Sequence, residues 1–455
     1  TVHNPRSREI PLQWSPGPGI IARMPSEGPG LDTSFIEAAA TAREASRRTR
    51  SRAALGVSAA VTVLWAIYAT VFDQWDRIAN SWYSALTMVF GSFVAGATPQ
   101  GGGAIAFPVF TKVLEVPSDV ARSFSLCIQT IGMGAATASI LINRRLIEWR
   151  AVMIGGATAM VSFLVALFVL ADPDKPFWPS RLPGPYVKVT FTILVSSMAF
   201  VVYLGTRIRI RKVDAALPPL NRRLYIALVI AGVAGGVASA LTGSGADVMI
   251  YLFVVVLLGV DPKVGVPTSV IVMTMVSVLG FLVLGVGDGQ LSVDLANGSS
   301  GEVVGLGGEA VTGTTGSGDV AAVYGEGGSE LSRVRFDLFG MWIAALPVVA
   351  WGAPLGSFVA SRMKARHLVM FVIGLAVAEA VSTAIFVPEL HELDWLLLYA
   401  VTGMILVGTT LFYLAKYRRR IFALPGLATD EGLARGHLDV VSGYEEQLSD
   451  EGPES

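Results

Sequence analysis

The chain has 455 residues, of which 53% are hydrophobic and only 15% are charged. Soluble domains carry about 25% charged residues, so this composition excludes an ordinary soluble protein. The net charge of -1 says little about partners, because it sums two aqueous faces of opposite character. We expect no nucleic-acid partner. The single cysteine, Cys127, lies in an apolar stretch, which excludes an internal disulfide and argues against a metal cluster.

Residues 1–52 form a basic segment without the early apolar core of a signal peptide. Its last part, residues 34–52, is predicted to be helical and ends in a cluster of arginines. Short basic segments beside a span stay in the cytoplasm, so we expect a cytoplasmic N-terminus. Apolar segments of about 20 residues, enough to cross a hydrocarbon core of about 30 Å, then recur along the chain. They include 53–72, 149–171, 186–206, 338–360, 366–386 and 395–414.

The apolar stretch 83–115 is interrupted at its centre by Thr98-Pro99-Gln100-Gly101-Gly102-Gly103. One continuous helix over this stretch would be about 50 Å long, far more than the bilayer core. Proline and a glycine triplet also break helices. The stretch is therefore either one broken span or a re-entrant hairpin of two half-helices.

The positions of basic residues favour the hairpin. If 83–115 returns to the outer face, the basic loops at 143–150 and 207–212 both fall inside, as the positive-inside rule requires. The same argument predicts a second hairpin at 223–259, broken at Thr242-Gly243-Ser244-Gly245 and entering from the cytoplasm. Downstream, Arg362, Lys364 and Arg366 then lie inside, the acidic segment 388–394 outside, and Lys416, Arg418, Arg419 and Arg420 inside.

The two interrupted stretches also resemble each other. Gly101 and Gly103 match Gly243 and Gly245, and further on Ser125 and Thr130 match Ser269 and Thr274 in the same order. Each copy is predicted to be a hairpin followed by three spans. Three crossings separate the hairpins, so the second copy is inverted relative to the first, as in secondary transporters whose sites lie near the midplane.

The predicted fold is thus an all-α polytopic membrane protein with an inverted repeat. Each half is a re-entrant broken-helix hairpin followed by three transmembrane helices, and one extra span lies at each end. The expected segments are a cytoplasmic basic segment at 1–52, an extra first span at 53–82, a first transport repeat at 83–212, a second at 213–386, an extra last span at 387–420 and an acidic cytoplasmic tail at 421–455.

The glycines suggest an anion site between the hairpins. A helix N-terminus carries unpaired N–H groups and a partial positive charge, and glycines let an oxyanion approach the backbone closely. Two such ends would meet near mid-membrane and suit a sulfonate, sulfite or carboxylate. Alternatively, the small residues only let the helices pack closely. Hydroxyl and amide side chains flank the two breaks at Thr98, Gln100, Thr242 and Ser244.

The glycine pattern at 96–108, the serine-bearing span start at 123–126 and the second copy at 239–270 with Pro267-Thr268-Ser269 resemble the sulfite exporter TauE/SafE family, the TSUP transporters. The resemblance covers roughly 83–386 and implies a bacterial inner-membrane carrier for sulfite, organosulfonates or related anions. By position, it places Gly101, Gly102, Gly103, Gly243 and Gly245 at the hairpin tips and hydroxyls of Ser125, Thr268 and Ser269 beside them.

This chain departs from the family pattern in its terminal segments and in a Gly-rich insertion at about 286–335. The insertion is acidic and is expected outside. Its alternating stretches 303–313 and 319–327 suggest a β-hairpin, and a solvated loop is the alternative. An acidic lid would repel an external anion, which favours export over uptake.

Polar residues inside spans are costly and usually functional. Arg122, Ser125 and Gln129 share a helix face and are predicted to line the site, with snorkelling to the headgroups the alternative for Arg122. Asp247 is predicted to carry a coupling proton, because burial disfavours the charged carboxylate, and capping of a helix start is the alternative. Glu379 is a second proton-coupling candidate. Lys112 and Lys263 are expected to snorkel.

Other classes of protein fit the sequence less well. No catalytic or metal-binding motif is present in the spans, so we expect no enzyme, metal site or cofactor. An anion channel remains an alternative, because facing hairpins also build channels, as does a carrier of uptake direction. The expected partners are a small anion and membrane lipid, and a homodimer is left open.

Cysteine labelling tests the topology. Cysteines placed at Asn143 and Lys212 should react with a membrane-impermeant reagent only after cells are opened, because both loops are predicted to be cytoplasmic. Labelling of either position in intact cells would contradict the hairpin at 83–115.

Overall fold

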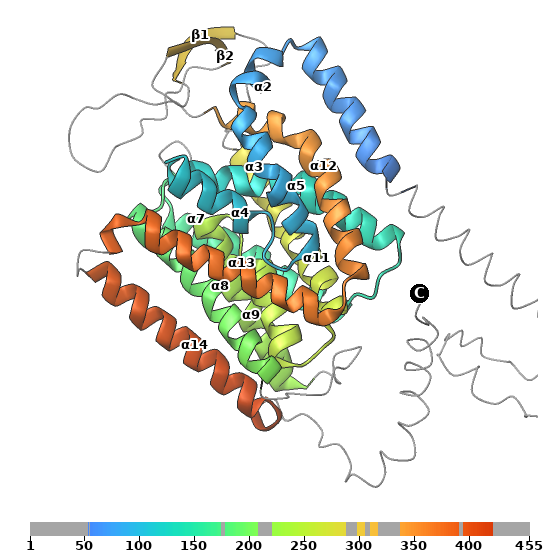
Figure 1. Cartoon of the computed structure of the whole chain (residues 1–455), viewed down its shortest axis with the longest axis vertical. Coiled ribbons are helices and arrows are strands. Elements are labelled where there is room, and N and C mark those ends of the chain that lie inside the picture. Colours follow the sequence, from blue (N-terminus) through green and yellow to red (C-terminus); the bar gives the residue numbers. More distant parts are fainter. Residues whose placement is uncertain are drawn as a thin grey trace, which may run out of the picture. The chain divides into compact units, whose positions relative to one another are not determined.

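The computed structural model describes residues 53, 55–173, 178–207, 221–287, 298–304, 310–316, 337–390 and 395–421. All of them belong to one compact unit, Arg50–Ser455, and nearly all are helical (Figure 1). Within these ranges, eight helices are long and apolar enough to cross a membrane. An α-helical polytopic membrane protein is therefore confirmed. The eight are Ser118–Ile142, Trp149–Leu170, Gly184–Tyr203, Arg222–Thr242, Pro262–Gly287, Leu338–Arg362, Arg366–Phe386 and Trp395–Tyr417.

Two helices are broken where the glycine clusters predict. Helix α3 (Trp82–Ala97) stops before Thr98, and α4 (Gly103–Pro108) begins after the break and continues as the π-helix η1 (Val109–Val113). Likewise α9 (Arg222–Thr242) ends at Gly243, and α10 (Ala246–Tyr251) continues as η3 (Leu252–Leu257).

Glycine is required in both breaks. Gly101 has φ +65° and Gly243 has φ +74°, in the left-handed region that side chains with a Cβ rarely adopt. Helix α9, with 21 residues, is by itself long enough to cross a membrane, whereas α3 has 16. Re-entry of the two broken stretches therefore stays a prediction.

The helices that follow each break form the centre of the bundle. Helix α5 (Ser118–Ile142) packs against α11 (Pro262–Gly280), and the hydroxyls of Thr137 and Thr274 are 2.8 Å apart between them. Helix α12 (Leu338–Arg362) packs against α3, and α7 (Ala157–Leu170) packs against α9.

Both of these side contacts are close. An ideal Cβ at Gly356 of α12 would lie 2.0 Å from Phe93 O of α3, and one at Gly236 of α9 would lie 2.2 Å from Ala159 O of α7. Small residues thus let the paired backbones touch, as is common between membrane helices.

The remaining long helices lie at one side. Helix α8 (Gly184–Arg207) packs against α13 (Ala365–Phe386) and α14 (Trp395–Ile421), and α14 lies along the edge of the bundle in Figure 1. Only 11% of the most apolar window of α14 is buried, as expected for a helix with a lipid-facing surface. The expected first span appears as an apolar helix at Leu55–Val71, one of the shorter ones.

Short elements complete the fold. Helix α2 (Trp75–Asn80) and the 3₁₀ turn η5 (Pro388–Leu390) were not predicted. Helix α6 (Trp149–Ala151) with η2 (Val152–Gly156) begins the predicted span 149–171, and η4 (Phe281–Gly287) continues α11. The Gly-rich insertion does contain an antiparallel hairpin, with β1 (Gly298–Val304) paired to β2 (Ala310–Gly316). These strands differ from the stretches that alternation suggested. Stretch 303–313 begins at the end of β1 and ends within β2, and 319–327 lies outside the described residues.

Candidate functional site

The two helix breaks touch each other. Ser244 Oγ of the second break donates a hydrogen bond to Gln100 O of the first, at 3.3 Å. An ideal Cβ at Gly103 would lie 2.5 Å from Ser244 Cβ, so only a residue without a side chain fits there. Residues 144 positions apart in the sequence therefore form one fully buried polar centre.

Helix α5 closes this centre from the side. Gln129 Nε2 donates to Gly243 O at 2.9 Å and to Ser125 Oγ at 2.6 Å, and Ser125 Oγ lies 3.2 Å from Gly243 O. Because a backbone carbonyl can only accept, the NH₂ group of Gln129 must face Gly243. Its Oε1 then faces Gly101, where an ideal Cβ would lie 3.0 Å from it.

Asp247 caps the start of α10. Its Oδ1 accepts hydrogen bonds from Gly245 N at 3.2 Å and Val248 N at 2.9 Å, and Ser239 Oγ accepts one from Ala246 N at 3.0 Å. The expectation that this helix start offers unpaired N–H groups is therefore wrong in this conformation. A carboxylate at a helix start satisfies those groups and is stabilised by the helix dipole.

Three acceptor oxygens at the centre have no hydrogen-bond partner in the described part of the chain: Asp247 Oδ2, Gln129 Oε1 and Gln100 Oε1. The first two converge on Gly101, whose ideal Cβ would lie 2.5 Å from Asp247 Oδ2. Buried polar atoms normally have partners, so these oxygens mark where a proton, water or ligand would bind.

The two threonines of the breaks complete the helix ends. Thr98 Oγ1 donates to Val94 O at 3.0 Å, and Thr242 Oγ1 contacts Ala238 O at 3.1 Å and Ser244 O at 2.6 Å. Gln100 Nε2 contacts Val372 O of α13 at 3.3 Å and ties the first break to that helix. These groups satisfy backbone carbonyls that water cannot reach.

Gly102 and Thr268 have neighbours other than the opposite break, and the place of Ser269 beside it stays a prediction. An ideal Cβ at Gly102 would meet Gly91 and Ala95 of α3 instead of the second break. Thr268 Oγ1 accepts a hydrogen bond from Glu148 N at 3.0 Å, at the loop before α6, and Ser269 Oγ donates to Val266 O of its own helix. Helix rotation decides which face of a span meets the centre, and on α11 it directs Thr268 to the loop before α6.

Arg122 lies beside the second break but does not snorkel, and its role toward an anion stays a prediction. Only 1% of the residue is exposed, which excludes snorkelling to the headgroups. Its guanidinium donates to Trp178 O at 2.7 Å and reaches Ala240 O, in the last turn of α9, at 3.4 Å. A cation at the C-terminal end of a helix offsets the negative end of its dipole. Arg122 thus joins the 178–183 segment to the second break.

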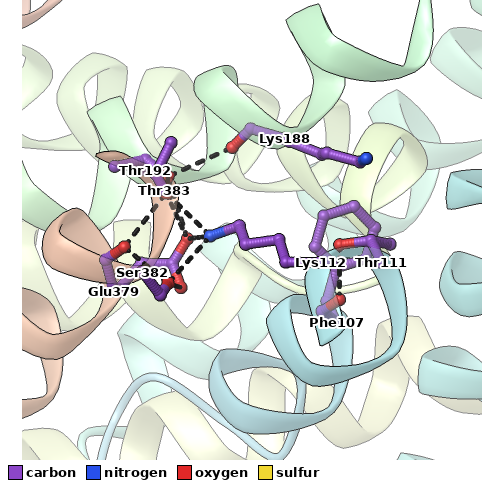
Figure 2. Close-up of polar contacts among 8 residues, drawn as sticks. All are labelled: Phe107, Thr111, Lys112, Lys188, Thr192, Glu379, Ser382 and Thr383. Carbon is purple, nitrogen blue, oxygen red and sulfur yellow. Dashed lines mark hydrogen bonds and ion pairs between the residues drawn. The ribbon is translucent and has the colours of Figure 1, made fainter. Parts of the chain in front are cut away.

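Lys112 was expected to snorkel, and this is wrong. Its Nζ donates to Glu379 Oε1 at 2.5 Å, and their side chains are only 1% and 3% exposed. Figure 2 shows the ammonium of η1 directed at Glu379, Ser382 and Thr383 of α13, with Thr192 of α8 beside them. A lysine and a glutamate inside two spans are a signal of such an ion pair. The two residues are 267 positions apart, so the sequence alone does not show that they are partners. Lys263, by contrast, is exposed.

A bundle of apolar helices around a buried polar centre, where two broken helices meet, is the architecture of membrane transport proteins. A family model described as sulfite exporter TauE/SafE matches residues 83–383, and the chain belongs to this family. Its members are membrane transporters of sulfur anions and not enzymes. The resemblance inferred from the glycine motifs is thus confirmed. No curated protein and no solved structure matches the chain.

Replacing Arg122 tests its structural role. Arg122→Leu should lower the free energy of unfolding in detergent without any anion by about 2–3 kcal/mol, because two buried carbonyls lose a charged donor. Chemical denaturation of both proteins measures the difference. Unchanged stability together with weaker anion binding would instead assign Arg122 to the substrate.

Proposed function

We propose that the protein is a secondary transporter that moves a small oxyanion, such as sulfite, an organosulfonate or a related carboxylate, across the bacterial inner membrane. The anion binds between the two helix breaks, and access alternates as one repeat rocks against the other. The observation that carries this proposal is the direct contact between Gln100 and Ser244, which brings both breaks to one buried point.

Reciprocal packing supports an inverted repeat. In chain order, each predicted repeat holds a broken helix and then three spans: α5, α7 and α8 in the first, and α11, α12 and α13 in the second. The broken helix of each repeat packs against the second span of the other, α3 on α12 and α9 on α7. The equivalent pairs α5 with α11 and α8 with α13 also pack together. A two-fold relation between the repeats requires that equivalent helices make such reciprocal contacts.

The carboxylate of Asp247 explains how the anion and a proton can be coupled. In this conformation Asp247 Oδ1 occupies the first N–H groups of α10, where a substrate oxyanion would otherwise bind. A second negative charge cannot share this buried site with an ionised Asp247. Protonation removes that charge and weakens the hold of Asp247 on the amides. Anion and proton binding then favour each other.

Export is the direction we favour. The insertion at about 286–335 contains seven acidic residues and two arginines. On the outer face, where we predict it to lie, this charge would repel an anion approaching from outside and would not hinder one arriving from the cytoplasm.

A matched pair of glycine variants tests the central site. Gly103→Ala should weaken binding and flux of the preferred anion at least tenfold, because the new methyl would collide with Ser244 Cβ and force the breaks apart. Gly134→Ala in α5, whose ideal Cβ has no atom within 4 Å, is the control and should behave as the unmodified protein.

The measurements are thermal-shift binding with sulfite, sulfate, thiosulfate, taurine, isethionate, sulfoacetate and acetate, followed by flux into proteoliposomes. Normal binding and flux by Gly103→Ala would place the substrate elsewhere. Flux that does not saturate with any anion would indicate a channel.

Asp247→Asn tests proton coupling. The variant keeps the size and the hydrogen-bond acceptor but cannot ionise. Anion exchange between the two sides should persist in proteoliposomes, whereas net flux driven by an imposed pH gradient should fall at least tenfold. A gradient response equal to that of the unmodified protein would show that Asp247 does not carry the coupled proton.

A further inference from the structure

The ion pair between Lys112 and Glu379 is not needed for packing. Burying two charges costs more free energy than packing apolar side chains of similar size, and intramembrane charges are usually functional. Lys112 lies on the second half of the first broken helix. The matching part of the second broken helix holds Val254, Val255 and Val256. The same fold element is therefore built once with valines and once with a buried lysine.

The groups around the Glu379 carboxylate are those that bind an oxyanion. Glu379 Oε1 accepts hydrogen bonds from Lys112 Nζ at 2.5 Å and from Thr192 Oγ1 at 2.8 Å. Thr383 Oγ1 lies 3.4 Å from the same oxygen, and Ser382 Oγ lies 3.5 Å from Oε2. An ammonium and three hydroxyls, drawn from three helical elements, thus surround one carboxylate (Figure 2).

This group of Lys112, Thr192, Ser382 and Thr383, called the cradle below, lies apart from the central site. Its lysine is on the same broken helix as Gly103. Lys112 is nine residues beyond Gly103, which corresponds to about 13 Å along a helix. Glu379 is seven residues before the end of α13, and Thr192 is eight residues after the start of α8. The topology predicted from the basic loops puts both of these helix ends on the outer face. The cradle would then lie between the centre and the extracytoplasmic side.

We propose that Lys112, Thr192, Ser382 and Thr383 form a second oxyanion site, which the carboxylate of Glu379 occupies in this conformation. The transported anion takes the site when Glu379 is protonated and releases Lys112. This proposal rests on the proposed function and adds a second binding site for the same anion. Glu379 competes with the transported anion for Lys112. When a proton neutralises Glu379, the transported anion replaces the carboxylate as the negative charge beside Lys112.

Few other charges act on this pair. Lys188 of α8 adds positive charge near Lys112, although in Figure 2 its carbonyl faces Thr192 and its ammonium points away from Glu379. Of the other elements packed against α13, α4 and η1 carry no charged residue besides Lys112, α11 carries only Lys263 at its start, and η5 carries Glu389. Glu379 is therefore the group whose protonation changes the charge of the cradle.

The test measures binding of isethionate to the purified full chain by calorimetry between about pH 6 and about pH 8, a range in which the sulfonate keeps its single negative charge. At the upper pH, Glu379→Gln should bind isethionate at least tenfold more tightly than the unmodified protein. Adding Lys112→Met to this variant should remove the gain. Asp247→Asn should also bind isethionate more tightly at the upper pH, and this gain should survive Lys112→Met, because Asp247 belongs to the other site.

The doubly apolar variant Lys112→Met/Glu379→Leu guards against a folding defect, because it leaves no unpaired charge. It should fold and bind isethionate at least tenfold more weakly near pH 6. Binding and pH dependence equal to those of the unmodified protein in this variant would overturn the second site and leave the central site standing. If the unmodified protein binds neither isethionate nor any anion of the panel, both sites are overturned.

Discussion

The need to satisfy every backbone polar group away from water governs the centre of this protein. A helix broken inside the membrane exposes carbonyls and N–H groups that lipid cannot bind. Gly243 O is bound by Gln129, Gln100 O by Ser244, and the first amides of α10 by Asp247 and Ser239. The two breaks can exist only because they face each other and α5. The same groups that stabilise the breaks are those that a substrate would use.

A consequence is that carboxyl groups of the protein already lie where an oxyanion would bind. Asp247 accepts hydrogen bonds from the first amides of α10, and Glu379 accepts one from the ammonium of Lys112. Neither Asp247 nor Lys112 is shared between the two copies of the motif, since Ile105 matches Asp247 and valines match Lys112. The shared parts, glycines and closely packed helices, build the scaffold. The parts that differ carry the charges, and the proposed proton coupling rests on these parts.

Sequence reasoning found the breaks but misplaced several side chains around them. Arg122, Lys112 and Thr268 are each assigned by local rules to a surface or to the site, and each has a distant partner instead: Trp178, Glu379 and Glu148. These partners lie 56, 267 and 120 residues away. Local spacing carries no information about such pairs, because they depend on how helices rotate and pack.

The sequence by itself determined the class of the protein, the positions of most spans, the two helix breaks and the family. Apolar length, helix-breaking residues and the glycine motif are properties of neighbouring residues, so the chain order records them. Only the tertiary structure decided that the breaks meet at Gln100 and Ser244, that Asp247 closes the start of α10, and that Lys112 is paired and buried. Each of these depends on desolvation, which acts on a side chain only once helices from distant parts of the chain enclose it.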